Sequence, residues 1–404
     1  MKPHILVIHR WRDQHALYET YLDHHANRVS YVTTDLARQS IPAGAADVIS
    51  VSATDDFHQV LAAIEKLAER FGHPERVADL NEGDLDTAAE LRQHLGCPGD
   101  DPERVARFRD KLTMAQMVAA AGIPIPAFAD APDLDAVLRF ADEHGLPAIV
   151  KPRRGTASRD VLRVDSVDDL ERLCQLPTEP RLVQEYCGDP IYHVDGLWTG
   201  TTLGPWRASR YLNNTCMEFA TGDTLGSVEV DEPELLGLLG EFTAAVGAAL
   251  SDQPWVFHLE VFVGVHPDGS PRLSFLEAGA RVGGAEIPFV WREVHAVDLM
   301  AAAMDIQLGR TPASDPAQTR RVGGWLLVRT SVPTPCRVVA ADLAVSEGRA
   351  PYAKVVPTVG QRVPKVGGYE HVGARFRFQG ASTDDVERAI TETAARFWLE
   401  CVPD

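Results

Sequence analysis

The chain has 404 residues, of which 45% are hydrophobic, and its 39 Lys and Arg against 58 Asp and Glu give a net charge of −19 at pH 7. This length and composition are typical of a globular protein of two or three domains, and the acidic balance excludes nucleic acid as a main partner because phosphate binding requires positive charge. The 6 cysteines form no CxxC pair, no signal-peptide pattern opens the chain and no apolar run reaches a membrane-spanning length, so we expect a cytoplasmic protein with reduced thiols and no membrane partner.

Strand-like and helix-like segments alternate over the first 100 residues, which predicts a small α/β domain with a parallel sheet. Short β-rich runs predict strands at His4–His9, Val29–Thr33 and Arg76–Leu80. Helical spacing of apolar residues predicts a helix at Phe57–Phe71, and composition favours another at His15–His25. No GxGxxG follows the first strand, so nicotinamide binding is not indicated. Glu82 follows the last strand, where open α/β sheets bind ligands, although a plain capping residue is the commoner case.

Asp101 and Pro102 have the pattern of a helix N-cap followed by proline at the first helical position. The helix is expected to run to about Ala121 and to stop at a glycine. Lys111 would lie in the middle of this helix, where a lysine is usually a solvated surface group, so its position alone assigns no function.

A polar loop follows the strand LPAIV, which ends at Lys151. The loop contains Arg153, Arg154, Gly155, Thr156 and Ser158. Small residues expose backbone N–H groups and arginines add positive charge, which is the composition of a phosphate-binding loop. A plain polar hairpin loop explains the same residues, and the loop alone favours that interpretation. A further strand is predicted at Leu182–Cys187.

Alternating residues predict a hairpin formed by Trp255–Gly264 and Arg272–Glu277. With Asp268-Gly269 as a two-residue turn, Glu260 faces Glu277 and His258 faces Gly279. Two facing carboxylates are destabilising unless they bind a divalent cation, one is protonated, or the register differs. Arg281 and a glycine pair that permits close backbone approach follow, which favours a ligand site.

The remaining segments give weaker signals. Ile191–Gly200 alternates like a strand, and the strand after it contains Arg207 and Arg210, which could bind a carboxylate. Helices are predicted at Val297–Leu308 and Thr383–Cys401, and a strand at Gly324–Arg329. Walker A, HExxH and GxSxG motifs are absent, which excludes the chemistries that they mark.

Several weak motifs occur in one order along nearly the whole chain. Their segments are RDKLTMAQMVAAAGIPIP, VKPRRGTASRDV, VQEYCGDPIYHVDG, FLEAGARVGG and GGYEHVGARFRF. This order resembles the ATP-grasp superfamily, and within it the carboxylate–amine ligases that include the L-amino acid (dipeptide) ligases. The resemblance implies a mixed α/β ATP-grasp fold with a Rossmann-like pre-grasp domain (1–100), a linking helix (101–124), a central lid subdomain (125–190) and a C-terminal catalytic domain (191–404).

The resemblance also implies roles for individual residues. Nucleotide binding would fall to Lys111, Lys151, Arg154, Thr156, Ser158, Glu185, Tyr186, Cys187 and Asp195. Glu260 and Glu277 would bind Mg²⁺, with two ions expected and Mn²⁺ as a substitute, between the phosphates of ATP. Arg281 would be the catalytic residue that stabilises an acyl phosphate and the tetrahedral intermediate formed when an amine attacks it.

The substrates implied are a small carboxylate and an amine derived from amino acids. Candidate substrate-binding residues are Glu82, Arg210, Glu218, His258 and Gly283, each of which is more often a plain surface or core polar residue. Alternatives are a biotin-carboxylase-like activation of bicarbonate and a non-catalytic nucleotide-binding module. The chain could also form a homodimer.

The sequence departs from the family pattern at two places. Gly279 stands where many members have a metal-binding Asn, so His258 or water is expected to fill that position. Ile191 stands where many members have a Glu that contacts ribose, so Asp189 could take over that contact.

Overall fold

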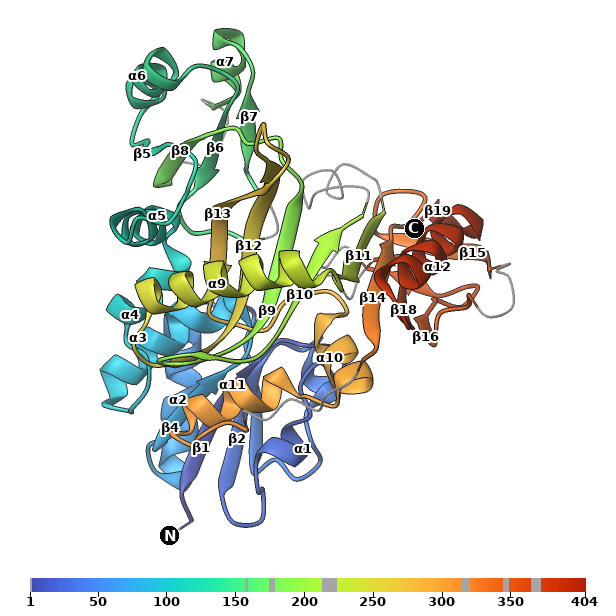
Figure 1. The fold of residues 1–404 in the computed structure, drawn as a ribbon. Helices are drawn as coiled ribbons and strands as arrows, with labels where there is room; N and C mark the ends of the chain where they lie inside the picture. Colours follow the sequence, from blue (N-terminus) through green and yellow to red (C-terminus); the bar gives the residue numbers. More distant parts are fainter. Residues whose placement is uncertain are drawn as a thin grey trace.

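Four β-sheets organise the chain in the computed structural model, which describes residues 2–156, 159–173, 179–212, 224–313, 320–343, 349–364 and 372–404. Two of the sheets have four strands each, one has eight and one has three. Figure 1 shows the first sheet at the bottom of the molecule (blue), the second at the top (teal to green), and the eight-stranded sheet between them. The hairpin of β12 and β13 reaches from the large sheet towards the upper one.

The first sheet is parallel, as the sequence predicts, with the strand order β3-β2-β1-β4. Its strands are β1 (His4–His9), β2 (Arg28–Thr33), β3 (Asp47–Ser50) and β4 (Arg76–Asp79). The helices α2 (Phe57–Phe71) and α3 (Leu85–Leu95) pack against it, and α2 has the predicted bounds. All four strands end at the edge that faces the large sheet, so Glu82, just after β4, lies close enough to that sheet to contact Arg281.

The helix predicted at His15–His25 is wrong for most of its length. Only α1 (Tyr18–Tyr21) is helical, and Leu22 is already extended. The Asp23 carboxylate accepts hydrogen bonds from the backbone N–H groups of His25 and Ala26, each at 2.8 Å. A local turn therefore takes the donors that a continuing helix would use.

The helix predicted from Pro102 to Ala121 is interrupted at Asp110. The chain forms α4 (Pro102–Arg109) and α5 (Lys111–Ala120), with Asp101 capping the first as predicted. The Asp110 carboxylate caps the second helix by accepting from the N–H groups of Leu112 and Thr113. Lys111 is therefore the first residue of a helix and not a residue in the middle of one.

The second four-stranded sheet has the order β5-β8-β6-β7. Its elements are β5 (Phe128–Asp130), α6 (Leu134–His144), β6 (Ala148–Pro152), β7 (Leu162–Val164), α7 (Leu170–Leu173) and β8 (Arg181–Glu185). Phe140, Val150 and Val183 form its core on the α6 side, which leaves Ile149, Lys151 and Gln184 on the other face.

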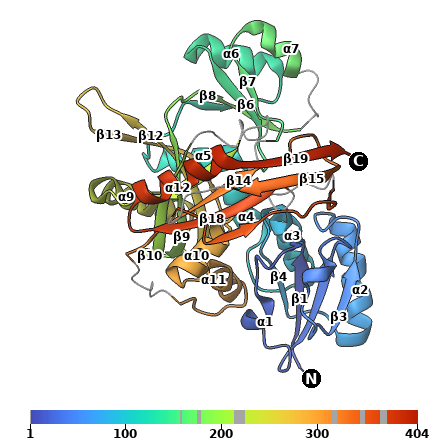
Figure 2. The same ribbon diagram turned by 90° about the vertical axis from the view of Figure 1, so that its right-hand side faces the viewer.

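The eight-stranded sheet has the order β13-β12-β9-β10-β11-β14-β18-β16. Its strands are β9 (Ile191–Thr199), β10 (Leu203–Tyr211), β11 (Leu225–Glu229), β12 (Pro254–Val265), β13 (Pro271–Gly279), β14 (Val322–Val328), β16 (Ala353–Val355) and β18 (Ala374–Gly380). Helix α9 (Pro233–Leu250) covers one face, and α10 (Ile287–His295) with α11 (Leu299–Gln307) covers the other (Figures 1 and 2).

Strand alternation in β12 is confirmed, but both faces are buried. Phe257 and Leu259 belong to the core under α9, whereas Val256 belongs to the core shared by α10, α11 and the first sheet. The helix predicted at Val297–Leu308 begins two residues later, at Leu299, because Asp298 caps it.

Helix α9 has 18 residues with a mean hydropathy of 1.3 and is, among the described residues, the one helix long and apolar enough to cross a membrane. Core helices pass the same test. Its residues Leu235, Leu239, Val246 and Leu250 are buried in the core against the large sheet.

The smallest sheet has the order β17-β15-β19 and packs beside α12 (Thr383–Arg396). Its strands are β15 (Cys336–Leu343), β17 (Arg362–Val363) and β19 (Phe397–Pro403). The helix predicted at Thr383–Cys401 is therefore too long. Phe397, Leu399 and Cys401 alternate into the core, and this strand period ends the helix.

Candidate active site

A pair of carboxylates occupies the end of the β12–β13 hairpin that is far from its turn. Glu260 pairs with Glu277, and His258 with Gly279, so the predicted pairing is confirmed. The turn itself differs from the prediction, because Val265 pairs with Pro271 and Gly269 adopts a positive φ of 88° in a longer loop. A register shift after Glu260 leaves Leu276 without an opposite residue and restores the predicted pairing.

This β-bulge shapes the site. In a regular strand, successive side chains point to opposite faces. At the bulge, Leu276 and Glu277 both line one cavity of about 320 Å³, together with Glu260. The cavity lies between the second sheet and the large sheet. Its other lining residues include Lys111, Ile149, Lys151, Thr156, Arg159, Arg163, Gln184, Glu185, Tyr186, Cys187, Ile191, Tyr211 and Phe262.

Two lysines bring positive charge to the carboxylates. Lys111 Nζ lies 3.3 Å from Glu277 Oε2 and donates a hydrogen bond to the carbonyl of Gly155 at 3.1 Å. Burial alone would raise the pKa of Glu277, but Lys111 and Lys151 lower it to about 2, so the carboxylate is ionised. Lys151 is only 6% exposed, and this burial lowers its pKa to about 8 although Glu277 opposes the shift. The group is therefore a cation that can lose its proton near neutral pH.

Apolar and polar residues divide the rest of the cavity. Ile149, Phe262 and Leu276 form an apolar part that suits a flat aromatic ring. Gln184 is 4% exposed and faces the same space from β8. Such a surface with few polar groups is typical of a nucleobase site.

The end of the predicted strand Leu182–Cys187 borders this part, although β8 itself already ends at Glu185. The N–H of Tyr186 donates a hydrogen bond to the carbonyl of Pro147 at 3.3 Å, and the Glu185 carboxylate accepts one from the N–H of Ala127 at 3.4 Å. The Arg163 guanidinium lies 4.2 Å above the Tyr186 ring at the rim. Sequence reasoning chose Glu185 and missed Gln184, although strand alternation from Ile149 across the sheet identifies the latter as the inward side chain.

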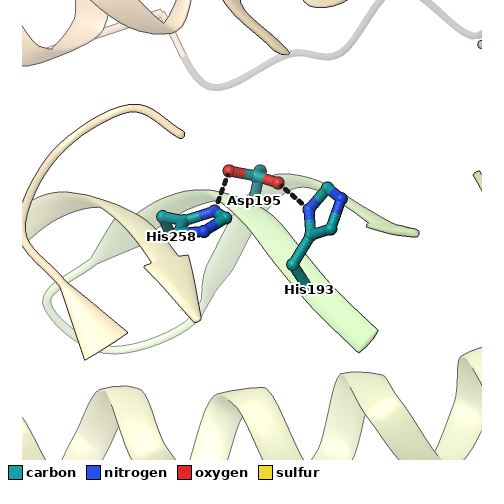
Figure 3. A group of neighbouring side chains, drawn as sticks. All are labelled: His193, Asp195 and His258. Atoms are coloured by element: carbon teal, nitrogen blue, oxygen red, sulfur yellow. Dashed lines mark hydrogen bonds and ion pairs between the residues drawn. The ribbon is translucent and has the colours of Figure 1, made fainter. Parts of the chain in front are cut away.

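The Glu260 carboxylate is held from its far side. Tyr211 donates a hydrogen bond from its hydroxyl to Glu260 Oε1 at 2.9 Å, and His258 Nε2 lies 3.8 Å from the same atom. Figure 3 shows how His258 and His193 both hydrogen-bond to Asp195, through their Nδ1 atoms at 2.8 and 2.6 Å. Burial would lower the pKa of His258, but Asp195 raises it to about 9. A protonated ring has no lone pair for a metal, so this state favours water over His258 opposite Gly279.

Oxygen ligands for a divalent cation are present in this arrangement. Glu260 and Glu277 face the same cavity from paired strands, and the low pKa of Glu277 provides the ionised oxygen that Mg²⁺ prefers. The two side chains therefore fit the predicted Mg²⁺ role.

Arg281 and Glu82 meet beyond Glu277, across the boundary of the first domain. Arg281 Nε donates to Glu82 Oε2 at 2.7 Å, and Arg109 Nη1 donates to Glu82 Oε1 at 2.8 Å. Burial would raise the pKa of Glu82, but Arg281 and Arg109 lower it. Glu82 therefore contacts two arginines, and Arg109 was missed because nothing in the sequence links α4 to β4.

Other predicted residues lie elsewhere. Asp195 is 2% exposed beneath Glu260 and is not among the residues that line this cavity, so its nucleotide-binding role stays a prediction. Arg210 points to the opposite face of β10 from Tyr211 and pairs with Glu387 of α12 at 2.5 Å, so its substrate-binding role stays a prediction. Gly283 lies against Asp195 and His258, so a Cβ at this position would approach Asp195 Oδ1 to 2.4 Å.

Five predicted residues remain to be placed. Arg154 pairs with Asp86 at 2.7 Å and is not part of the cavity lining, whereas Thr156 is. Ser158 and Glu218 lie outside the described residues. Asp189 reaches the cavity, but its Oδ2 accepts from Arg272 at 2.8 Å, so a ribose contact from Asp189 stays a prediction.

Solved structures resemble the chain over its whole length. An L-amino acid ligase from Bacillus licheniformis matches with a TM-score of 0.73 and 16% identity, covering 100% of this chain and 99% of that one. N5-carboxyaminoimidazole ribonucleotide synthetase from Thermotoga maritima matches with a TM-score of 0.65 and 14% identity, covering 100% of both chains. The biotin carboxylase domain dimer of the Hydrogenobacter thermophilus 2-oxoglutarate carboxylase, solved with MgADP and bicarbonate, matches with a TM-score of 0.73 and 13% identity over 99% of this chain and 91% of that one. Such low identities establish a shared fold only.

Sequence relatives match over shorter segments, and no family model matches the chain. An uncharacterized protein, y4rH, from Sinorhizobium fredii is 37% identical over 75 residues, which are 19% of this chain and 16% of the relative. The carbamoyl phosphate synthase large chain of Streptomyces griseus is 31% identical over 114 residues, 26% of this chain and 10% of the relative. The chain thus matches less than a fifth of the length of either relative.

Proposed function

Because the chain has the ATP-grasp fold, we propose that it is an ATP-dependent ligase that activates a carboxylate as an acyl phosphate and couples it to an amine, releasing ADP and phosphate. One observation carries this proposal. Glu260 and Glu277 face each other in a cavity that also contains Lys111 and Lys151 and ends in an apolar part large enough for a nucleobase. Paired acids and cations beside an aromatic-sized slot suit a nucleoside triphosphate with its metal.

The residues divide the chemistry between them. A carboxylate is a poor electrophile, and phosphorylation gives it a good leaving group. Lys111 and Lys151 would neutralise the phosphate oxygens, and Glu260 with Glu277 would hold Mg²⁺, which supplies positive charge between the transferring phosphates. Arg281 lies beyond Glu277 and lowers its pKa, so its charge reaches the place where the acyl group would react. The domain boundaries expected from the sequence put this place between the first domain and the catalytic domain.

Amino-acid-derived substrates are our proposal for the acid and the amine. Support comes from the L-amino acid ligase, which matches the chain from end to end. The biotin carboxylase domain has an equal TM-score, so bicarbonate activation is the second candidate. A homodimer stays a prediction.

A screen of phosphate release with Mg-ATP over amino-acid pairs tests the proposal. We expect release that requires both an acid and an amine, whereas bicarbonate dependence would favour the second candidate and no release at all would favour a nucleotide-binding module. Glu277→Gln should abolish release while the protein stays folded, and Glu241→Gln, at an exposed position on α9, should change nothing. Near-normal release by Glu277→Gln at saturating Mg²⁺ would refute the metal assignment.

A further inference from the structure

Five alternating charges form a continuous chain along the boundary between domains. Arg281 Nε donates to Glu82 Oε2 at 2.7 Å, and Glu82 Oε1 accepts from Arg109 Nη1 at 2.8 Å. Arg109 Nε donates to Asp86 Oδ2 at 3.2 Å, and Asp86 Oδ1 accepts from Arg154 Nη1 at 2.7 Å. Each of the four carboxylate oxygens therefore accepts from one arginine.

The chain joins parts of the protein that the fold keeps separate. Glu82 and Asp86 belong to the first domain, Arg109 ends α4, and Arg154 lies in the loop after β6. Arg281 follows β13 in the large sheet. The contact between α3 and α4 brings the two carboxylates within reach of one guanidinium.

Arg109, at the centre of this charge chain, is its most buried arginine. Arg109 is 7% exposed, whereas the side chains at the two ends, Arg281 and Arg154, are 21% and 48% exposed. A buried guanidinium requires charged partners, and its planar fork sets their directions where a lysine would not. Arg109 therefore determines where Glu82 and Asp86 point.

We propose that Arg109 is a positioning residue that aligns Arg281, through Glu82, with the loop residue Arg154, through Asp86. Arg281 lies beyond Glu277, and Arg154 lies in the loop whose Gly155 and Thr156 line the cavity. Neither the two carboxylates nor the three arginines line the cavity itself. The charge chain therefore acts on the chemistry through the position of Arg281 beyond Glu277 and through the position of that loop. This inference rests on the proposed ligase function for its purpose, but the coupling itself does not depend on turnover.

Limited trypsin digestion measures the coupling directly, because trypsin must capture the Arg154 side chain that Asp86 holds. The variants are Asp86→Asn, which acts on Arg154 directly, and Arg109→Lys, which can act only through Asp86. Arg104→Lys is the matched control, since Arg104 lies on the same helix but pairs with Asp100 at 2.5 Å, away from the site. We expect both test variants to speed cleavage after Arg154 by about two- to fivefold, the range for a partly exposed ion pair, and the control to leave it unchanged.

Two further readouts separate positioning from a general loss of structure. Cleavage after Arg388, an exposed arginine on α12, should stay at the wild-type rate, and the Kd for Mg-ADP should stay within about twofold. With a substrate pair from the phosphate-release screen, Arg109→Lys should lower kcat by about 10- to 100-fold at an unchanged KM for ATP.

Cleavage of Arg109→Lys at the wild-type rate after Arg154 would overturn the inference, as would equal acceleration after Arg388. Faster cleavage after Arg154 alone supports the coupling even if no acid and amine are found to react. Failure to find a reacting acid and amine would reject the proposed function, whereas the faster cleavage after Arg154 would still support the charge chain.

Discussion

Lys151 should make nucleotide binding depend on pH between 7 and 10. Lys151 is 6% exposed, and burial lowers its pKa to about 8, against Glu277, which raises it. Bound phosphates favour the charged form, so binding raises the pKa of Lys151 and takes up a proton whenever the free protein has lost it. The affinity for ADP must then fall as the pH rises through 8.

The size of the effect follows from the titration of one group. Above its pKa in the free protein, each pH unit removes a factor of ten from the fraction that is protonated, so the Kd for ADP should rise about tenfold between pH 8.5 and 9.5. The phosphates of ADP are fully ionised throughout this range, since their second pKa is about 6. The phosphates therefore do not contribute to the pH dependence of the Kd for ADP.

Isothermal titration calorimetry with ADP in EDTA measures this slope, and buffers of different ionisation enthalpy report the proton taken up. The arginine in Lys151→Arg keeps its charge at every pH used, so the Kd of this variant for ADP should not change with pH. Lys66→Arg, at an exposed position on α2, is the control and should behave like the wild type. A flat wild-type profile, or the same slope in Lys151→Arg, would refute the reasoning.

Three further variants and one control variant test other contacts. Gly283→Ala should cost about 1–3 kcal/mol in urea unfolding, because its Cβ would meet Asp195 Oδ1 at 2.4 Å. Gly237→Ala, at an exposed position of α9 where a Cβ has no neighbour within 4 Å, should stabilise by about 0.5–1 kcal/mol. Equal unfolding midpoints for the two variants would contradict the packing described. Asp110→Ala should lower the free energy of unfolding by about 1–2 kcal/mol through the lost cap of α5, and an unchanged midpoint would mean that the cap does not matter. Tyr211→Phe should weaken Mn²⁺ binding to the ADP complex by about tenfold, measured by paramagnetic resonance, and unchanged binding would remove Tyr211 from the support of Glu260.

The acid pair shows how far a local pattern leads. Alternation and a turn signal predicted that Glu260 faces Glu277, and the structure confirms the pair. The predicted two-residue turn is wrong, and the bulge at Leu276 compensates for it. A bulge leaves no pattern in the flanking alternation, so the sequence could not reveal that Leu276 and Glu277 share one cavity.

Element ends were harder to predict than elements. Asp110 had the signature of a helix cap, but the apolar pattern continued through it and concealed the break between α4 and α5. The alternation of apolar residues from Phe397 onward is also present in the sequence. The residues before it favour a helix, however, so the predicted helix was extended too far. In both places two local preferences competed, and packing decided between them.

The sequence by itself determined the faces of the strands, the parallel first sheet, the helix cap at Asp101 and the order of the charged groups that line the cavity between the second sheet and the large sheet, because these depend on residues close together in the chain. Only the tertiary structure decided which charge meets which. Arg281 and Glu82 are 199 positions apart, and Arg210 and Glu387 are 177 apart. Alternation predicts which face of a strand a side chain takes but not what packs against that face. The contacts of Arg210 with Glu387 of α12 and of Arg109 with Glu82 therefore depend on tertiary packing that the sequence pattern does not show.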